Sequence, residues 1–376
     1  MEVYLDNAAT TIVCTEAADI AYKVMTEFYG NPSSTHTKGR EAKAVLDKAR
    51  RQVADALGCS PNEVFFTSCG SESDNWAIIK GAESMMRKGR HIISSAVEHD
   101  AVRKTLGELE KQGFEVSFLE PEPDGSVSVS AVENALREDT VLVTLMMVNN
   151  ETGGVTDIAG IAKMLKAHRS QALLHTDAVQ GFMKLPFSAK TLGADMISIS
   201  GHKIHAPKGI GALYIKTGVK IKPFIRGGSQ EAGMRAGTEA MPQIAAFGAA
   251  CETAKKGMRI NTENMAKLRQ SAVERICADM PEARVIGGGA PHILSVSLPG
   301  WRSEVIMNFL EAKRVYVSRS SACKKGGRSH VLEAMKLPTE VIDGAVRISF
   351  SRFTTQSDID VLCSALKEAH DTLAHR

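Results

Sequence analysis

Paired cysteines, long apolar runs and excess charge are all scarce in this 376-residue chain. None of its seven cysteines forms a Cys-x-x-Cys pair, which argues against a disulfide framework and a zinc site and favours a reducing cytoplasm. The longest apolar run, residues 141–148, is too short to span a bilayer, and the N-terminus shows no secretory signal. The net charge of +3 is too small to indicate nucleic acid as the main partner. We therefore expect a cytoplasmic protein with no metal site, no membrane contact and no direct nucleic-acid partner.

The rest of the composition is that of an ordinary globular protein, with 43% hydrophobic and 24% charged residues. Apolar runs typical of buried strands alternate with helical patterns over the first two thirds of the chain. This alternation predicts an α/β fold with a mostly parallel sheet covered on both faces. The predicted strands are residues 64–67, 91–95, 141–148, 172–176, 195–199 and 210–215, and the predicted helices are 37–57, 76–86 and 158–168.

The pattern changes near residue 254, inside a long helical region at residues 242–280. Residues 293–298 alternate like a half-exposed strand, and shorter strands and helices follow up to residue 373. We therefore predict a large domain at residues 13–253 and a smaller α+β domain formed by residues 1–12 and 254–376.

Lys203 lies in a turn, residues 200–209, between the last two strands of the first region. Pro207 and Gly209 fix such a turn and let the backbone approach a ligand closely. Partial desolvation at the edge of a sheet lowers the pKa of a lysine, which makes Lys203 a candidate Schiff-base lysine. Ser200 and His202 could donate hydrogen bonds to a phosphate. The alternative is a surface turn with a solvated lysine.

A second turn, residues 68–75, joins the strand 64–67 to the helix that follows it. Free backbone N–H groups and the helix dipole make such a helix start an anion site. Ser71 and Ser73 would serve equally well as ordinary helix caps. The turn lacks the Gly-Lys-Ser/Thr of a nucleotide P-loop, which argues against ATP.

Polar residues follow several of the predicted strands, where open α/β sheets bind their ligands. Together with Lys203 they match the needs of pyridoxal phosphate (PLP). A buried carboxylate such as Asp177 would keep the pyridine nitrogen protonated. His99 could stack on the ring and move protons, and Asn150 and Gln180 could hydrogen-bond the phenolic oxygen.

The chain resembles the cysteine desulfurases of the NifS/IscS type, which are fold-type I PLP enzymes of the class-V aminotransferase family. The resemblance covers nearly the whole chain and implies a seven-stranded, mostly parallel sheet in the large domain. It also implies that the small domain carries a catalytic-cysteine loop. The matching motifs are YLDNAATT from Tyr4, YGNPSS from Tyr29, TSCGSESDN from Thr67, EH at Glu98, NNETG from Asn149, TDAVQ from Thr176, SGHKIHAPKGIGALY from Ser200, MRAGTE from Met234, SSAC from Ser320 and VRISFSRFTT from Val346.

The motifs and the resemblance together assign the site residues. The catalytic residues are Lys203, Cys323 and His99. The resemblance implies a homodimer in which Thr238 reaches the phosphate of the other subunit's cofactor. The predicted cofactor-binding residues are Gly70, Ser71, His99, Asn150, Asp177, Gln180, Ser200, His202, Lys203 and Thr238. The predicted substrate-binding residues are Asn31, Asn150 and Arg347.

The resemblance implies that the enzyme removes sulfur from L-cysteine, leaves L-alanine and carries the sulfur as a persulfide on Cys323. The sulfur would pass to an acceptor such as an iron–sulfur scaffold protein or a tRNA-thiolation enzyme. Lys324, Lys325 and Arg328 add positive charge that should lower the pKa of the Cys323 thiol. Glycines in the same loop should give it mobility.

The chain departs from the family at several positions. Cys69 and Ala206 stand where glycine is usual, and Ala232 stands where arginine is common. The loop after Cys323 is about two residues shorter than in the long-loop members and more basic, which leaves its reach and its sulfur acceptor open.

Two other interpretations compete with a desulfurase. A selenocysteine lyase, or another PLP-dependent lyase or aminotransferase of the same fold, would use the same cofactor, although an aminotransferase needs no thiol. An inactive relative acting as a scaffold would not need Lys203 and Asp177. The product formed from L-cysteine would separate these interpretations.

Overall fold

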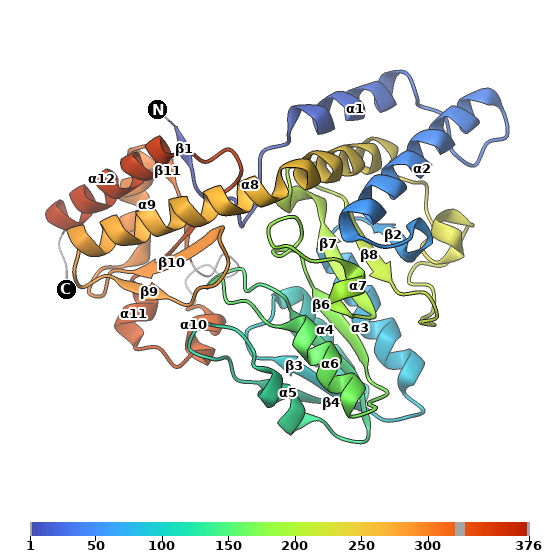
Figure 1. Ribbon diagram of the computed structural model, residues 1–376, viewed down its shortest axis with the longest axis horizontal. Coiled ribbons are helices and arrows are strands. Elements are labelled where there is room, and N and C mark those ends of the chain that lie inside the picture. The colour runs from blue at the N-terminus through green and yellow to red at the C-terminus, as the bar shows by residue number, and fades with distance from the viewer. Residues whose placement is uncertain (1, 320–327, 374–376) are drawn as a thin grey trace.

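A seven-stranded sheet forms the centre of the larger of two parts of the molecule (Figure 1). The computed structural model describes residues 2–319 and 328–373. In order across the sheet, the strands are β2 (Val64–Thr67), β8 (Gly211–Ile215), β7 (Met196–Ser200), β6 (Leu173–Asp177), β5 (Thr140–Met146), β3 (His91–Ser95) and β4 (Glu115–Leu119). The five strands from β7 to β4 run parallel, whereas β8 is antiparallel to both of its neighbours. The predicted α/β fold with a mostly parallel seven-stranded sheet is confirmed.

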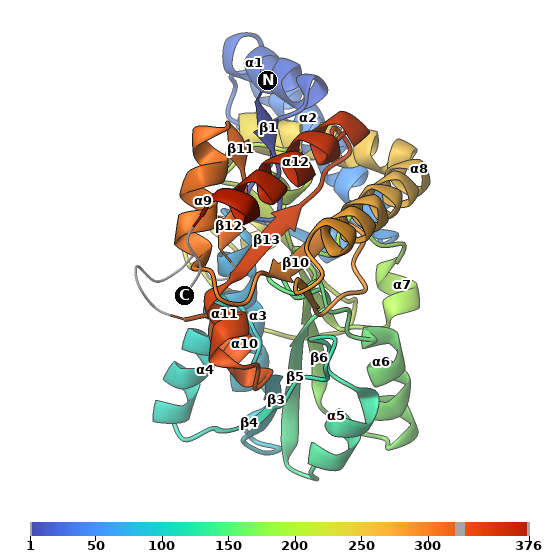
Figure 2. The same ribbon diagram turned by 90° about the vertical axis from the view of Figure 1, so that its left-hand side faces the viewer.

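Helices cover both faces of this sheet, with α3 (Gly70–Met85) and α4 (Asp100–Lys111) on one face (Figure 2). On the other face lie α5 (Val129–Ala135), α6 (Ile158–Ala167) and α7 (Ala189–Leu192). The remaining helical segments of this part are α1 (Thr15–Thr26), α2 (Thr37–Leu57) and the 3-10 turns η1 (Pro61–Glu63), η2 (Gly201–Lys203) and η3 (Gln230–Gly233).

The sequence explains why these segments adopt these structures. All seven residues of β5 are buried, and Val and Leu dominate it, as expected for a strand covered on both faces. Helix α2 has a buried apolar stripe and ends at Gly58, which adopts a left-handed conformation at φ +66°. Helix α4 begins after His99, whose ring accepts the backbone N–H of Ala101.

The smaller part contains a four-stranded sheet, in the order β12 (Ser318–Arg319), β13 (Ala345–Ser349), β10 (Ile293–Ser297) and β9 (Arg284–Ile286). Its pairings are antiparallel. A separate parallel pair joins β1 (Val3–Tyr4) to β11 (Val315–Tyr316), so the chain's first residues lie in the smaller part. The helices of this part are α9 (Ser303–Ala312), α10 (His330–Ala334), α11 (Thr339–Asp343) and α12 (Gln356–Thr372).

Helix α8 (Met241–Asp279) runs through both parts (Figure 1). Its first half contributes Ile244 and Phe247 to the apolar core of the larger part, whereas Met265 and Ile276 belong to the core of the smaller part. At 1.5 Å per residue the helix is about 58 Å long, enough to reach through both cores. The predicted domain limits, residues 13–253 against residues 1–12 and 254–376, stay a prediction. No helix among the described residues has the length and apolar character of a membrane span.

Two predictions about secondary structure are wrong. Helix α3 begins at Gly70 rather than at residue 76, because the small polar residues after Cys69 form its first turn. Strand β10 was expected to be half exposed, but all five residues are buried. Leu294 and Val296 pack in the core of the smaller part, whereas Ile293 packs in the core of the larger part. The sequence pattern also did not predict α1, α4 or the edge strand β4.

Candidate active site

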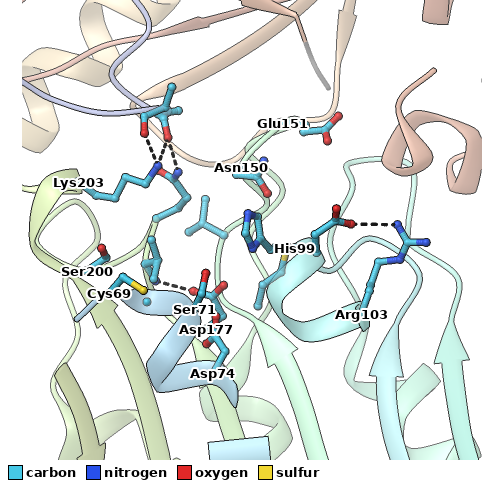
Figure 3. Close-up of a pocket in the computed structure, with 18 of the residues that line it drawn as sticks. Cys69, Ser71, Asp74, His99, Arg103, Asn150, Glu151, Asp177, Ser200 and Lys203 are labelled. Atoms are coloured by element: carbon cyan, nitrogen blue, oxygen red, sulfur yellow. Dashed lines mark hydrogen bonds and ion pairs between the residues drawn. The ribbon is translucent and has the colours of Figure 1, made fainter. Parts of the chain in front are cut away.

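A pocket of about 330 Å³ lies between the carboxyl ends of β5, β6 and β7 and strand β13 of the smaller part (Figure 3). This is the edge of a parallel sheet at which α/β proteins bind ligands. The predicted site residues that line the pocket are Gly70, Ser71, His99, Asn150, Asp177, Gln180, Ser200, His202, Lys203 and Arg347.

Lys203 ends the short turn η2, directly after β7. Its Nζ donates to the carbonyl of Ala8 at 2.5 Å and to that of Ala9 at 2.7 Å. Burial, aided by the charge of Arg347, lowers the pKa of Lys203 to about 8, although Asp177 acts in the opposite direction. The amine is therefore much more often neutral near pH 7 than that of an exposed lysine. The alternative of a solvated surface lysine is ruled out.

Asp177 closes strand β6 at the floor of the pocket and is buried (Figure 3). The backbone N–H of Val179 donates to its Oδ1 at 2.9 Å. Burial raises the pKa of Asp177, whereas the charges of His99 and Lys203 lower it. A further positive charge in the pocket would lower the pKa of Asp177 and hold it as a carboxylate. A pyridinium nitrogen is a group of this kind.

The start of α3 fits a phosphate. Cys69 precedes the helix, and its side chain caps no backbone N–H there. A Cβ atom at Gly70 would lie 2.8 Å from Cγ2 of Val179, so glycine keeps this turn open. The buried hydroxyl of Ser200 has no hydrogen-bond partner among the described residues. A phosphate here would accept hydrogen bonds from Ser200 and from the first turn of the helix.

His99 and His202 both line the pocket and have different hydrogen-bond partners. His99 Nδ1 accepts the N–H of Ala101 at 3.1 Å, which leaves Nε2 as the N–H donor of a neutral ring. The His202 ring lies 3.2 Å from the hydroxyl of Thr10. Burial and the charge of Lys203 lower the pKa of His202 to about 4, so this ring is neutral near pH 7.

Asn150 and Gln180 both line the pocket, but Asn150 forms its hydrogen bond to the protein through its backbone, whereas Gln180 does so through its side chain. The carbonyl of Asn150 accepts from Arg347 at 2.9 Å. The side-chain amide of Gln180 donates to the carbonyl of Ala8 at 2.9 Å. Gln180 therefore helps to hold the carbonyl that Lys203 contacts.

Arg347 is the main contribution of the smaller part to the pocket, and its side chain is only 3% exposed. Nη1 donates to the carbonyl of Asn150, and Nη2 donates to Oδ1 of Asp6 at 2.9 Å. The buried Nε has no partner among the described residues. Arg347 thus keeps a free donor beside the pocket, which suits a carboxylate.

Three predicted site residues are not among those that line the pocket. Asn31 is exposed, and its side chain accepts the backbone N–H of Ser33 at 2.9 Å. Thr238 is also exposed, and its predicted contact with another subunit stays a prediction. Cys323 lies outside the described residues. Of its predicted basic neighbours, Arg328 pairs with Asp343 at 2.8 Å, so that charge is already neutralised in part.

Several buried or half-buried carboxyl groups near the pocket were not predicted: Asp100 and Glu151, which line it, and three more, Asp6, Asp74 and Glu98. Asp6 pairs with Arg347, Asp74 lines the pocket, and Glu98 accepts the backbone N–H of Met146, which also lines the pocket. Burial and the charge of Asp177 raise the pKa of Asp74, and burial raises the pKa of Glu98 to about 8. All three lie within quoted motifs, but a motif alone does not reveal which of its carboxyl groups are buried.

The site therefore offers the groups that PLP requires. Ser71, Ser200 and the first turn of α3 would hold the phosphate, and Asp177 would meet the pyridine nitrogen. His99 would lie at the ring, and Lys203 would bind the aldehyde. When bound, PLP supplies an electron sink for negative charge at the substrate's α-carbon.

Comparisons with known proteins agree with this geometry. The class-V aminotransferase family matches residues 3–362 of the chain. A cysteine desulfurase IscS from Methanosarcina thermophila is 41% identical over 97% of this chain and 91% of its own length. Cysteine desulfurase 2 from Trichormus variabilis is 42% identical over 95% of this chain and 90% of its own length.

Solved structures of similar proteins also superpose closely on this chain. A NifS-like protein superposes with a TM-score of 0.94 at 37% identity, over 99% of this chain and all of its own. The protein SspA, solved in complex with cysteine, superposes with a TM-score of 0.83 at 33% identity, over 94% of this chain and all of its own. The chain therefore belongs to the class-V aminotransferase family and, within it, to the PLP-dependent cysteine desulfurases.

Proposed function

We propose that this desulfurase transfers the sulfur of L-cysteine to Cys323 and releases L-alanine. The observation that carries the proposal is the meeting of Lys203, Asp177 and Arg347 in one pocket. The first two residues suit PLP, and the third suits a substrate carboxylate. The cysteine bound in the SspA structure supports the same substrate here.

Each side chain has a defined task in this proposal. Arg347 binds the substrate carboxylate through a charge-assisted pair. Lys203, neutral in a larger fraction of molecules than an exposed lysine, accepts the proton of the α-carbon. His99 donates or accepts a proton beside the ring, using the nitrogen that Ala101 leaves free.

The sulfur step conserves atoms and electrons. The Cys323 thiolate attacks the sulfur of the substrate, and a sulfur–sulfur bond forms as the carbon–sulfur bond breaks. The electron pair of the broken bond stays with the substrate's β-carbon, which takes up a proton and becomes the methyl group of alanine. Cys323 is left as a persulfide, ready to pass sulfur to an acceptor protein.

We also propose a homodimer located in the cytoplasm. Large apolar side chains are exposed at Ile12, Tyr22, Met25, Tyr29 and Phe353, and a subunit interface would cover them. The exposed Thr238 fits the predicted contact with the other subunit's cofactor.

The described cysteines are free thiols, in keeping with a reducing compartment. The sulfur acceptor is proposed to be an iron–sulfur scaffold protein or a tRNA-thiolation enzyme.

The test compares Cys323→Ser with Cys277→Ser, which removes an exposed thiol on α8 and serves as the matched control. We expect Cys277→Ser to form alanine and protein-bound persulfide as the wild type does. Cys323→Ser should keep the cofactor's absorbance and its change on adding L-cysteine, but lose alanine formation. Alanine formation by Cys323→Ser at the wild-type rate would show that Cys323 is not the acceptor.

A further inference from the structure

A second, smaller cavity of about 30 Å³ adjoins Lys203. Lys203 and Lys184 both line it, and Lys203 also lines the larger pocket. A water molecule needs roughly 10–15 Å³ of such space and two to four polar partners, so this cavity can hold one. The other polar residues that line it are Thr11, His205, Asn261, Ser351 and Arg352.

A chain of hydrogen bonds also connects the two lysines. Lys184 Nζ donates to Oε1 of Gln180 at 3.4 Å, and the amide of Gln180 donates to the carbonyl of Ala8. Lys203 Nζ donates to the same carbonyl at 2.5 Å. The two amines are therefore linked both through the small cavity and through Gln180.

Lys184 is buried among positive charges. Its side chain lies inside the protein, and the amide oxygen of Gln180 is its hydrogen-bond partner. The groups that face it include Lys203, Arg347 and Arg352. Burial, followed by the charges of Lys203 and Arg347, lowers the pKa of Lys184 to about 7. His205 and His292, which also lie near it, have pKa values lowered mainly by burial and are neutral.

Unlike Lys184, Lys203 is near charges of both signs. Burial and Arg347 lower its pKa, whereas Asp177 and Asp6 raise it. His202, on the same turn, is neutral near pH 7. Two ammonium groups lining one buried cavity repel each other in a medium of low dielectric constant. Near neutral pH this repulsion disfavours the state in which both lysines carry a proton, and the lower pKa of Lys184 makes it the one that is neutral more often.

Lys203 has to lose its proton before its amine can bind the aldehyde of PLP. In that step the new bond would form at Nζ, and the aldehyde oxygen would leave as water with the two hydrogens that the neutral amine still carries. Loss of the proton from Lys203 removes one of the two charges that, after burial, lower the pKa of Lys184. The geometry points to Lys184 as the residue that takes up the proton of Lys203 when the cofactor binds. Lys184 does not line the larger pocket, so we assign it the role of holding a proton for Lys203 rather than a catalytic role. This inference rests on the proposed role of Lys203.

The test measures protons released when PLP binds to the cofactor-free protein, by calorimetry at pH 7.5 in buffers with different ionisation enthalpies. Lys184→Met and Lys184→Gln are the test variants, and the second keeps a polar group beside Gln180. Lys190→Met, which removes an exposed lysine of α7, is the matched control. Both test variants should release roughly half to one more proton per chain than the wild type and the control do.

Equal proton release by the wild type and both Lys184 variants would overturn the inference. An effect of Lys184→Met that Lys184→Gln abolishes would also overturn it, because packing rather than the proton would then be responsible. Failure of the proposed role of Lys203 has a different signature. In that case Lys203→Ala would still bind PLP covalently, as judged by absorbance and by mass after borohydride reduction.

Discussion

The two sides of the pocket are built in different ways. The side that we propose binds the cofactor, called here the cofactor side, consists of residues at strand ends and helix starts of the larger part, namely Ser71, His99, Asp177, Ser200 and Lys203. The side that we propose binds the substrate, called here the substrate side, consists of Arg347 on β13 of the smaller part and Asp6 near the N-terminus. The cofactor side is thus fixed by one sheet, whereas the substrate side depends on how the two parts meet. Changes on the first side should affect the chemistry, and changes on the second should affect substrate affinity.

The largest effect is expected on the cofactor side at Lys203. Lys203→Ala removes the amine that binds PLP and the base for the α-proton, so alanine formation should fall to the background rate. Alanine production and cofactor absorbance would be measured together. A mutant that keeps the absorbance of covalently bound PLP would remove Lys203 from its proposed role.

Asp177→Asn should have the next largest effect. The amide keeps the shape of the side chain but supplies no negative charge to the pyridine nitrogen, so kcat should fall roughly a hundredfold to a thousandfold. The Michaelis constant should change much less, because the substrate side is intact. Steady-state kinetics with L-cysteine would show this, and an unchanged kcat would contradict the role of Asp177.

On the substrate side, Arg347→Lys should raise the Michaelis constant for L-cysteine about tenfold to a hundredfold, because a lysine has a single donor nitrogen and cannot pair with Asp6 and present a second donor nitrogen to a carboxylate. The affinity for PLP should stay close to that of the wild type. Comparing the Michaelis constant for L-cysteine with the dissociation constant of PLP tests whether the two sides of the pocket act separately. If the mutant loses as much affinity for PLP as for L-cysteine, the two sides do not act separately.

Glu98→Gln should act on stability and has the smallest expected effect. The folded-state pKa of Glu98 is about 8, above its ordinary value of 4.5. The folded state therefore binds the proton more tightly, and this group makes the protein less stable as pH rises from 4.5 through 8. Glutamine can still accept the bonds from Ser95 and Met146 but cannot ionise. At pH 8.5 Glu98→Gln should melt on the order of 2 °C higher than the wild type, and the gain should vanish at pH 5.

The sequence predicted the cofactor side better than the substrate side, for a physical reason. Strand periodicity placed β3 at its observed limits, and the polar residues at strand ends led to Asp177 and Lys203. Parallel strands share one carboxyl edge, so local patterns there imply proximity. The pairing of Asp6 with Arg347 joins residues 341 positions apart, and no local pattern encodes it.

The burial of individual residues was also hard to predict. Strand β10 alternates in polarity, yet its polar face is covered where the two parts meet, so the half-exposed assignment failed. Lys184 could not be told from the other lysines in the sequence, because the cavity that it lines is formed with residues as distant along the chain as Phe350 and Arg352. Burial that arises from packing between distant segments leaves little trace in local sequence patterns.

The central claim is that sulfur leaves L-cysteine for a protein thiol, and the most direct measurement is the product balance of a single turnover. The PLP-loaded protein is mixed with L-cysteine without reductant, and alanine, pyruvate and protein-bound sulfur are measured. We predict equal amounts of alanine and protein-bound sulfur, with no pyruvate. Pyruvate accompanied by free sulfide would contradict the account and indicate a lyase that expels sulfide directly.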